Sequence, residues 1–197
     1  MKLTFTLLLL LFSLSAFCKT VLCLGDSLTE GYQLNKEEAY PYLIEQALKP
    51  KHPDIKVING GVSGATTASG LKRLDWYLKA KPDIMILALG ANDGLRGLKV
   101  NDAEKNLTSV IEKAQARGIT VMIAGMKMPP NYGEKYRLEF EALYPKLAKK
   151  YNLKLIPFLL EGVATKSELN LADGIHPNPK GHQVMAKTII KYLEPEL

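Results

Sequence analysis

The chain has 197 residues, of which 47% are hydrophobic and 23% are charged, a balance typical of one folded domain whose core is stable without disulfide bonds. Its formal net charge is +6, but the lysines are scattered, and no basic tract, zinc-ligand spacing or aromatic RNA motif favours a nucleic-acid partner. An ordinary lysine-rich surface is the favoured interpretation, and peripheral contact with anionic membranes or envelope polymers is the alternative.

The first 18 residues predict an export signal. One lysine, an uncharged apolar run and small residues follow in the order that a secretory signal peptide requires. The run is shorter than the roughly 20 residues that span a bilayer. We expect cleavage after Cys18, or alternatively after Ala16, which leaves residues 19–197 as one domain in the periplasm or outside the cell. An uncleaved anchor is the competing interpretation, and Phe17 argues against a lipoprotein.

Five apolar stretches predict strands, at residues 20–25, 55–60, 83–90, 118–125 and 153–158. Their nearly continuous apolar character is typical of strands covered on both faces. Between and after them, apolar residues recur at helical spacing in segments that contain Leu71, Ala103, Tyr136 and Met185. This alternation predicts an α/β fold, namely a three-layer α/β/α sandwich with a five-stranded parallel sheet in the flavodoxin-like order 2-1-3-4-5. Cys23 in the first strand is expected to be a small buried hydrophobe.

The predicted order makes three loops neighbours. In such sheets ligands bind at the carboxyl ends of the strands, beside the point where the strand order reverses. The loops after the first three strands contain "GDSLTEG", "GGVSGATT" and "GANDGLRG". Residues far apart in the sequence are therefore expected to face one another at this edge.

Ser27 in the first of these loops needs a base before its hydroxyl can act as a nucleophile. His52 precedes the second strand, at the opposite edge, and His182 near the start of the last helix is interpreted as a helix-surface residue. His176 follows the fifth strand, at the same edge as Ser27, and is the candidate base. Asp173, three residues earlier, is the candidate to orient it, although an Asx turn that only shapes the loop is the alternative.

Acyl transfer also requires donors for the oxyanion, placed in advance. The backbone N–H of Ser27 at a helix start, the backbone N–H of Gly64 and the side-chain amide of Asn92 all lie on the three neighbouring loops. Taken singly, Gly64 could serve turn geometry and Asn92 could bond its own backbone. Their joint placement indicates an oxyanion hole.

At this point the chain resembles the SGNH, or GDSL, hydrolase family. Its four blocks stand in family order over almost all of the expected mature chain: "GDSL" at 25–28, "VSGATT" with its glycine at 64, "GAND" at 90–93 and "DGIH" at 173–176. The resemblance implies a nucleophile, an orienting acid and a base at Ser27, Asp173 and His176. It implies oxyanion donors at Ser27, Gly64 and Asn92, and a reaction without metal or organic cofactor.

Two longer stretches, "LGANDGLRG" and "MPPNYGEKYRLEFEALYPKLAK", are similar to the bacterial periplasmic thioesterase, lysophospholipase and arylesterase subgroup. That resemblance implies hydrolysis of acyl thioesters, carboxyl esters or lysophospholipids by a protein that we expect to be a monomer. Ala91 and Thr29 differ from the commonest family sequence in their blocks, but neither difference removes a catalytic group.

Other functions fit the residues less well. The glycine-rich loops lack both the phosphate-loop lysine and the G-x-G-x-x-G spacing of nucleotide-binding folds, and Ser27 lacks the G-x-S-x-G of α/β-hydrolases. A non-catalytic binding protein would have no need of the three catalytic residue types. An O-acetyl esterase acting on carbohydrate or peptidoglycan with the same triad is the alternative enzyme. Loop residues that could line an apolar groove favour acyl esters over sugars: Leu95, Met126, Met128, Pro129 and Pro130. Arg96 could meet an anion or only solvent.

Overall fold

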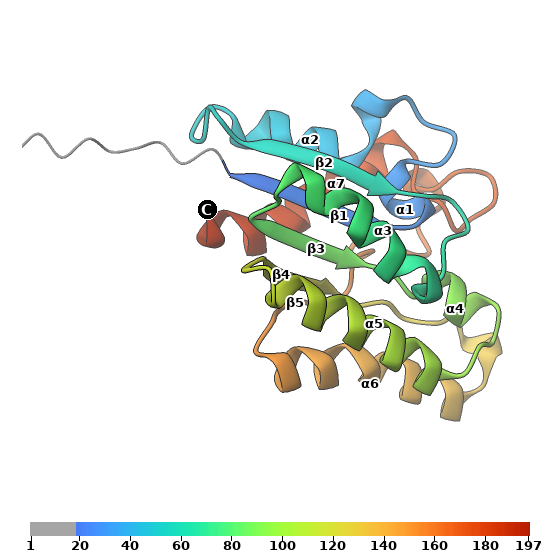
Figure 1. Cartoon of the computed structure of the whole chain (residues 1–197). Coiled ribbons are helices and arrows are strands. Elements are labelled where there is room, and N and C mark those ends of the chain that lie inside the picture. Colours follow the sequence, from blue (N-terminus) through green and yellow to red (C-terminus); the bar gives the residue numbers. More distant parts are fainter. Residues whose placement is uncertain (1–18) are drawn as a thin grey trace, which may run out of the picture.

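A computed structural model describes residues 19–197, so the predicted signal peptide lies outside the described residues. Five parallel strands form one sheet in the order β2-β1-β3-β4-β5. Figure 1 shows them with their carboxyl ends at one edge. They are β1 (Thr20–Gly25), β2 (Lys56–Gly61), β3 (Ile84–Ala88), β4 (Thr120–Ala124) and β5 (Lys154–Ile156). The predicted order is confirmed, although β3, β4 and β5 are shorter than predicted and β2 begins one residue later.

Helices cover both faces of the sheet. One face carries α3 (Gly70–Tyr77), α5 (Val100–Gln115) and α6 (Glu134–Tyr151), of which α3 and α5 lie in front of the sheet in Figure 1. On the other face α2 (Tyr40–Leu48) packs against α7 (Pro179–Leu193). This confirms the three-layer sandwich. No helix within the described residues is both long and apolar enough to cross a membrane.

The core residues follow from the strand pattern. All five residues of β3 are buried, and five of the six in β1, as expected when helices pack on both sides of a parallel sheet. Cys23 lies in this core, and its burial raises the pKa of the thiol to about 12, which keeps it protonated and unreactive. Its role as a small hydrophobe is confirmed.

The register of the strands builds the catalytic edge. Gly25 at the end of β1 pairs with Gly61 of β2 on one side and with Ala88 of β3 on the other. The three loops that follow therefore start side by side. Gly61 is needed because a Cβ there would overlap the backbone of Glu30, so the chain after β1 and the end of β2 approach more closely than any other residue permits.

Candidate active site

Ser27 opens α1 (Ser27–Glu30), directly after β1. The preceding Asp26 is buried and caps this short helix, because its carboxylate accepts the backbone N–H of Leu28 at 3.1 Å. Burial raises the pKa of Asp26 to about 6, despite the bond from Leu28 and the nearby His176. The cap holds the start of α1, and with it Ser27, at the edge of the sheet.

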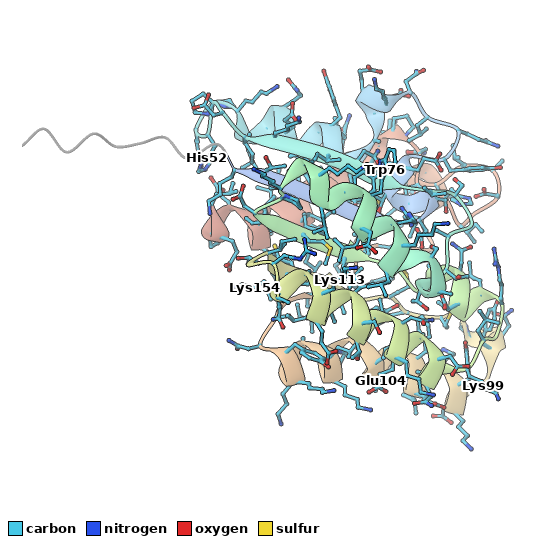
Figure 2. The ribbon with its side chains drawn as sticks, in the orientation of Figure 1. His52, Trp76, Lys99, Glu104, Lys113 and Lys154 are labelled. Carbon is cyan, nitrogen blue, oxygen red and sulfur yellow. The ribbon has the colours of Figure 1, made fainter. Side chains whose placement is uncertain are left out.

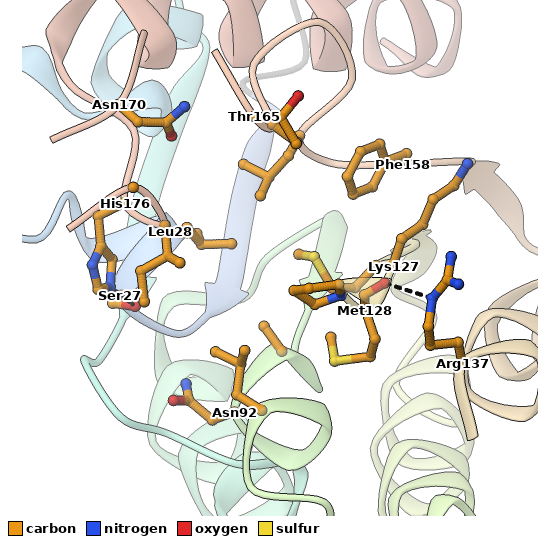
Figure 3. A pocket seen from close by; sticks show the side chains of 18 of the residues that line it. Ser27, Leu28, Asn92, Lys127, Met128, Arg137, Phe158, Thr165, Asn170 and His176 are labelled. Atoms are coloured by element: carbon orange, nitrogen blue, oxygen red, sulfur yellow. Dashed lines mark hydrogen bonds between the residues drawn. The ribbon is translucent and has the colours of Figure 1, made fainter. Parts of the chain in front are cut away.

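The structure brings the three predicted triad residues together. His176 Nε2 lies 2.9 Å from Ser27 Oγ, and His176 Nδ1 lies 2.7 Å from Asp173 Oδ2. A carboxylate only accepts hydrogen bonds, so the imidazole carries its proton on Nδ1 and presents Nε2 as the acceptor for the serine hydroxyl. In Figure 3 the imidazole stands directly beside Ser27 at one end of a pocket.

The loop between β5 and α7 fixes the geometry of this pair. The other carboxylate oxygen of Asp173, Oδ1, accepts the backbone N–H groups of Ile175 and His176, each at 3.0 Å. Asp173 therefore forms an Asx turn and also contacts the imidazole, so the turn does more than shape the loop. Although partial burial acts to raise the pKa of Asp173, the backbone N–H and imidazole of His176 hold it below the usual value.

The two other predicted oxyanion donors, Gly64 and Asn92, follow β2 and β3, and Asn92 lines the same pocket as Ser27. Gly64 has a positive φ of 75°, and its carbonyl accepts a bond from Arg96 Nη2 at 3.0 Å, which holds the peptide that follows Gly64. Asn92 lies in α4 (Ala91–Leu95) and donates from Nδ2 to the carbonyl of Ala65 at 3.1 Å. Asn92 thus bonds a neighbouring loop, and its second amide hydrogen remains available. Arg96 has a backbone carbonyl as its partner, which sequence reasoning did not foresee.

Sequence reasoning missed a buried connection between the loops that carry Gly64 and Asn92. Asp93 accepts the backbone N–H of Thr67 at 2.8 Å and its hydroxyl at 2.6 Å, and Asn106 donates to the same hydroxyl at 3.0 Å. These bonds tie the loop after β2 to the loop after β3. The aspartate of "GAND" was the available signal, although its partners lie far away in the sequence. Tyr32, whose ring centroid lies 4.4 Å from that of His176, was also missed.

The pocket of Figure 3 extends from Ser27 as a mostly apolar cavity of about 380 Å³. All five residues predicted to line an apolar groove do line it: Leu95, Met126, Met128, Pro129 and Pro130. Phe158, Leu160 and Ile175 complete the apolar wall. We call this cavity the acyl groove below.

The other two histidines lie away from Ser27. His52 precedes β2 at the opposite edge of the sheet, as predicted (Figure 2). His182 is not a surface residue, so that prediction is wrong: it is only 1% exposed, and its Nδ1 accepts the backbone N–H of Tyr40 at 3.1 Å. It is buried because the packing of α7 on α2 covers this face, and burial lowers its pKa to about 4.

Comparisons with known proteins identify the family of this chain. The model of the GDSL-like lipase/acylhydrolase family matches residues 23–184. An arylesterase of Vibrio mimicus is 41% identical over 94% of this chain and 97% of its own. Thioesterase 1/protease 1/lysophospholipase L1 of Escherichia coli K12 is 37% identical over 98% of this chain and 92% of its own.

A solved structure agrees as well. The crystal structure of TesA superposes with a TM-score of 0.87 at 36% identity, covering 91% of this chain and all of that one. Sequence, fold and the arrangement around Ser27 thus lead to the same conclusion: the chain belongs to the GDSL-like lipase/acylhydrolase family and is a serine hydrolase of ester bonds.

Proposed function

We propose that this protein hydrolyses carboxyl esters and acyl thioesters, lysophospholipids included, through an acyl-enzyme on Ser27. The observation that carries the proposal is the chain of contacts from Asp173 through His176 to Ser27, at 2.7 Å and 2.9 Å. It is the arrangement in which a carboxylate orients an imidazole and the imidazole takes the serine proton.

In the first half-reaction, His176 Nε2 removes the hydroxyl proton as Ser27 Oγ attacks the acyl carbon. The N–H groups of Ser27 and Gly64 and the amide of Asn92 bind the oxyanion, a contribution that is typically on the order of 10²-fold or more per donor. Asp173 stabilises the imidazolium. The imidazolium then protonates the leaving oxygen or sulfur, whose bond to the acyl carbon breaks.

In the second half-reaction, His176 takes a proton from water, and the resulting hydroxide attacks the acyl-enzyme. The same donors bind the second oxyanion, and the Ser27 ester bond breaks as His176 returns the proton to Ser27 Oγ. Both steps balance with water as the only co-reactant. The residues of this chain therefore suffice for the whole cycle.

The acyl groove supports an acyl chain as substrate rather than an acetylated sugar. Its walls are chiefly apolar side chains, and burial of each methylene of an acyl chain contributes about 0.8 kcal/mol. A sugar would instead need a dense set of polar partners. The carbohydrate or peptidoglycan O-acetyl esterase is therefore the less favoured function.

The site of action is part of the proposal. The apolar run before residue 19 supports export and cleavage of a signal peptide, after which residues 19–197 act in the periplasm or outside the cell. N-terminal sequencing of the protein isolated from a cell envelope fraction tests this. A chain that retains residues 1–18 would contradict it.

The test of the chemistry uses the mature chain and a fluorophosphonate probe, which reacts with activated serines. Mass spectrometry should place the label on Ser27, and Ser27→Ala should abolish both labelling and hydrolysis of p-nitrophenyl butyrate. Ser109→Ala is the matched control, because that exposed serine bonds only within α5. Circular dichroism checks that the variants fold. Turnover by folded Ser27→Ala at the wild-type rate would refute the mechanism.

A further inference from the structure

The acyl groove is apolar along its walls but cationic at its far end. In Figure 3 Ser27 and His176 stand at one end, and Lys127 and Arg137 stand at the other. Phe158 lies between them. Purely apolar walls would suit any fatty acyl chain, so two cations at the end of the groove need a separate explanation.

Neither cation has an anionic partner within the described residues. Arg137 is half-buried and donates from Nε to the carbonyl of Met128 at 3.1 Å, which positions the guanidinium and leaves its terminal NH₂ groups unbonded. Lys127 Nζ lies 5.3 Å from the ring centroid of Phe158. Glu141 also lines the groove, one helical turn after Arg137, but it forms no ion pair with either residue. Two cations and one carboxylate leave this end net positive.

The orientation of the substrate follows from the proposed function. His176 must protonate the leaving group, which therefore lies on the imidazole side of Ser27. The acyl chain then enters the groove that leads away from His176 (Figure 3). The last atoms of a chain of sufficient length would reach Lys127 and Arg137.

We propose that the groove selects acyl chains that end in a carboxylate, that is, half-esters and half-thioesters of dicarboxylic acids. This inference rests on the proposed function and defines its substrate class. A methyl end would remove water from the half-buried guanidinium of Arg137 without compensation, whereas the exposed Lys127 would keep most of its water. A carboxylate would instead accept charge-assisted hydrogen bonds from the guanidinium, whose planar fork matches its two oxygens.

The experiment compares pairs of p-nitrophenyl esters that share one leaving group. The mono-esters of adipate, suberate and sebacate are measured beside the neutral hexanoate, octanoate and decanoate. For the length that fits the groove, kcat/KM for the half-ester should exceed that for the neutral ester by about tenfold, as expected for a partly exposed charged hydrogen bond. Added salt should reduce this ratio.

Variants test whether Lys127 and Arg137 cause the preference for half-esters. Arg137→Gln and Lys127→Gln should each lower the ratio, whereas Glu141→Gln should raise it. Arg137→Gln also removes the bond to the Met128 carbonyl and could change the shape of the groove. Lys127→Gln removes a positive charge without breaking that bond. Lys135→Gln is the matched control, because this exposed lysine of α6 does not line the groove.

The outcomes separate the two proposals. If the wild-type protein hydrolysed none of these esters, the proposed function itself would be refuted. Hydrolysis of neutral esters with a ratio at or below one at all lengths, or a ratio that both cation variants leave unchanged, would overturn only the carboxylate selection.

Discussion

Asp173→Asn is the sharpest test of the proposed triad, because the structure dictates how asparagine must sit. Oδ1 accepts two backbone N–H groups, from Ile175 and His176. An asparagine that turned its NH₂ towards them would place donor against donor. The oxygen therefore stays on the backbone, and the NH₂ group occupies the position of Oδ2, facing His176 Nδ1.

That arrangement forces the wrong tautomer of the imidazole. Opposite an NH₂ group, Nδ1 must accept, so the proton moves to Nε2, which then donates to Ser27 Oγ instead of taking its proton. We expect kcat to fall on the order of 10³- to 10⁴-fold with little change in KM, the cost found when a triad aspartate becomes asparagine. Because Asn keeps both backbone bonds, its free energy of unfolding should stay within about 1 kcal/mol of wild type.

Asp173→Ala provides the comparison. It removes the acceptor of both backbone N–H groups, and at about 0.5–1.5 kcal/mol each the protein should lose about 1–3 kcal/mol of stability together with its activity. Turnover of p-nitrophenyl butyrate and urea unfolding are measured on all three proteins. An Asp173→Asn protein with a kcat within tenfold of wild type would refute the assignment of His176 as a base oriented by Asp173.

Three further predictions concern the surroundings of the triad. Asn92→Ala should lower kcat on the order of 10²-fold at nearly constant KM; an unchanged kcat would remove Asn92 from the oxyanion hole. The pKa of His182 is lowered from 6.5 to about 4, so its neutral form is favoured in the fold, and acidification from pH 6.5 to 4 should cost wild type about 3 kcal/mol of stability relative to His182→Gln. Asp26 acts in the opposite direction, because its pKa is raised from 3.8 to about 6. Wild type should lose about 2 kcal/mol relative to Asp26→Asn as the pH rises from 4 to 6. Urea unfolding across this pH range checks both, and parallel curves for variant and wild type would contradict them.

The sheet could be predicted from the sequence because its signal is local. Each strand is a short apolar run, and alternation with helical spacing leaves few topologies for a parallel sheet. α2 was missed because it begins with Tyr-Pro, and a proline there indicates a turn as readily as the start of a helix. The same gap explains the error at His182. Its burial depends on Tyr40, 142 residues away, and no local pattern reports a contact between α7 and a helix that was not predicted.

The proposed triad was predictable for a different reason. Each of its residues, Ser27, Asp173 and His176, lies in a short block with a distinctive sequence, and the order of the blocks identified the family. The residues that pack around the proposed site lie in no such distinctive sequence. Thr67 and Asn106 take part only because Asp93 of α4, which follows β3, bonds Thr67 in the loop after β2. Nothing in the sequence around Tyr32 indicates a role, because its contact with His176 forms only when the chain after β5 folds back to this edge.

Register therefore decides whether these blocks form a site at all. Gly25, Gly61 and Ala88 end their strands at one level, which brings Ser27, Gly64 and Asn92 to the same edge. A shift of β2 by one residue would move Gly64 by about 3.3 Å, more than the whole length of a hydrogen bond. The close approach of Gly61 to Glu30 opposes the shift that would bring Val62 to this level, because a Cβ at that point would overlap the backbone of Glu30. Gly61 thus helps to hold the loop that carries Gly64, the proposed oxyanion donor, in its place at this edge.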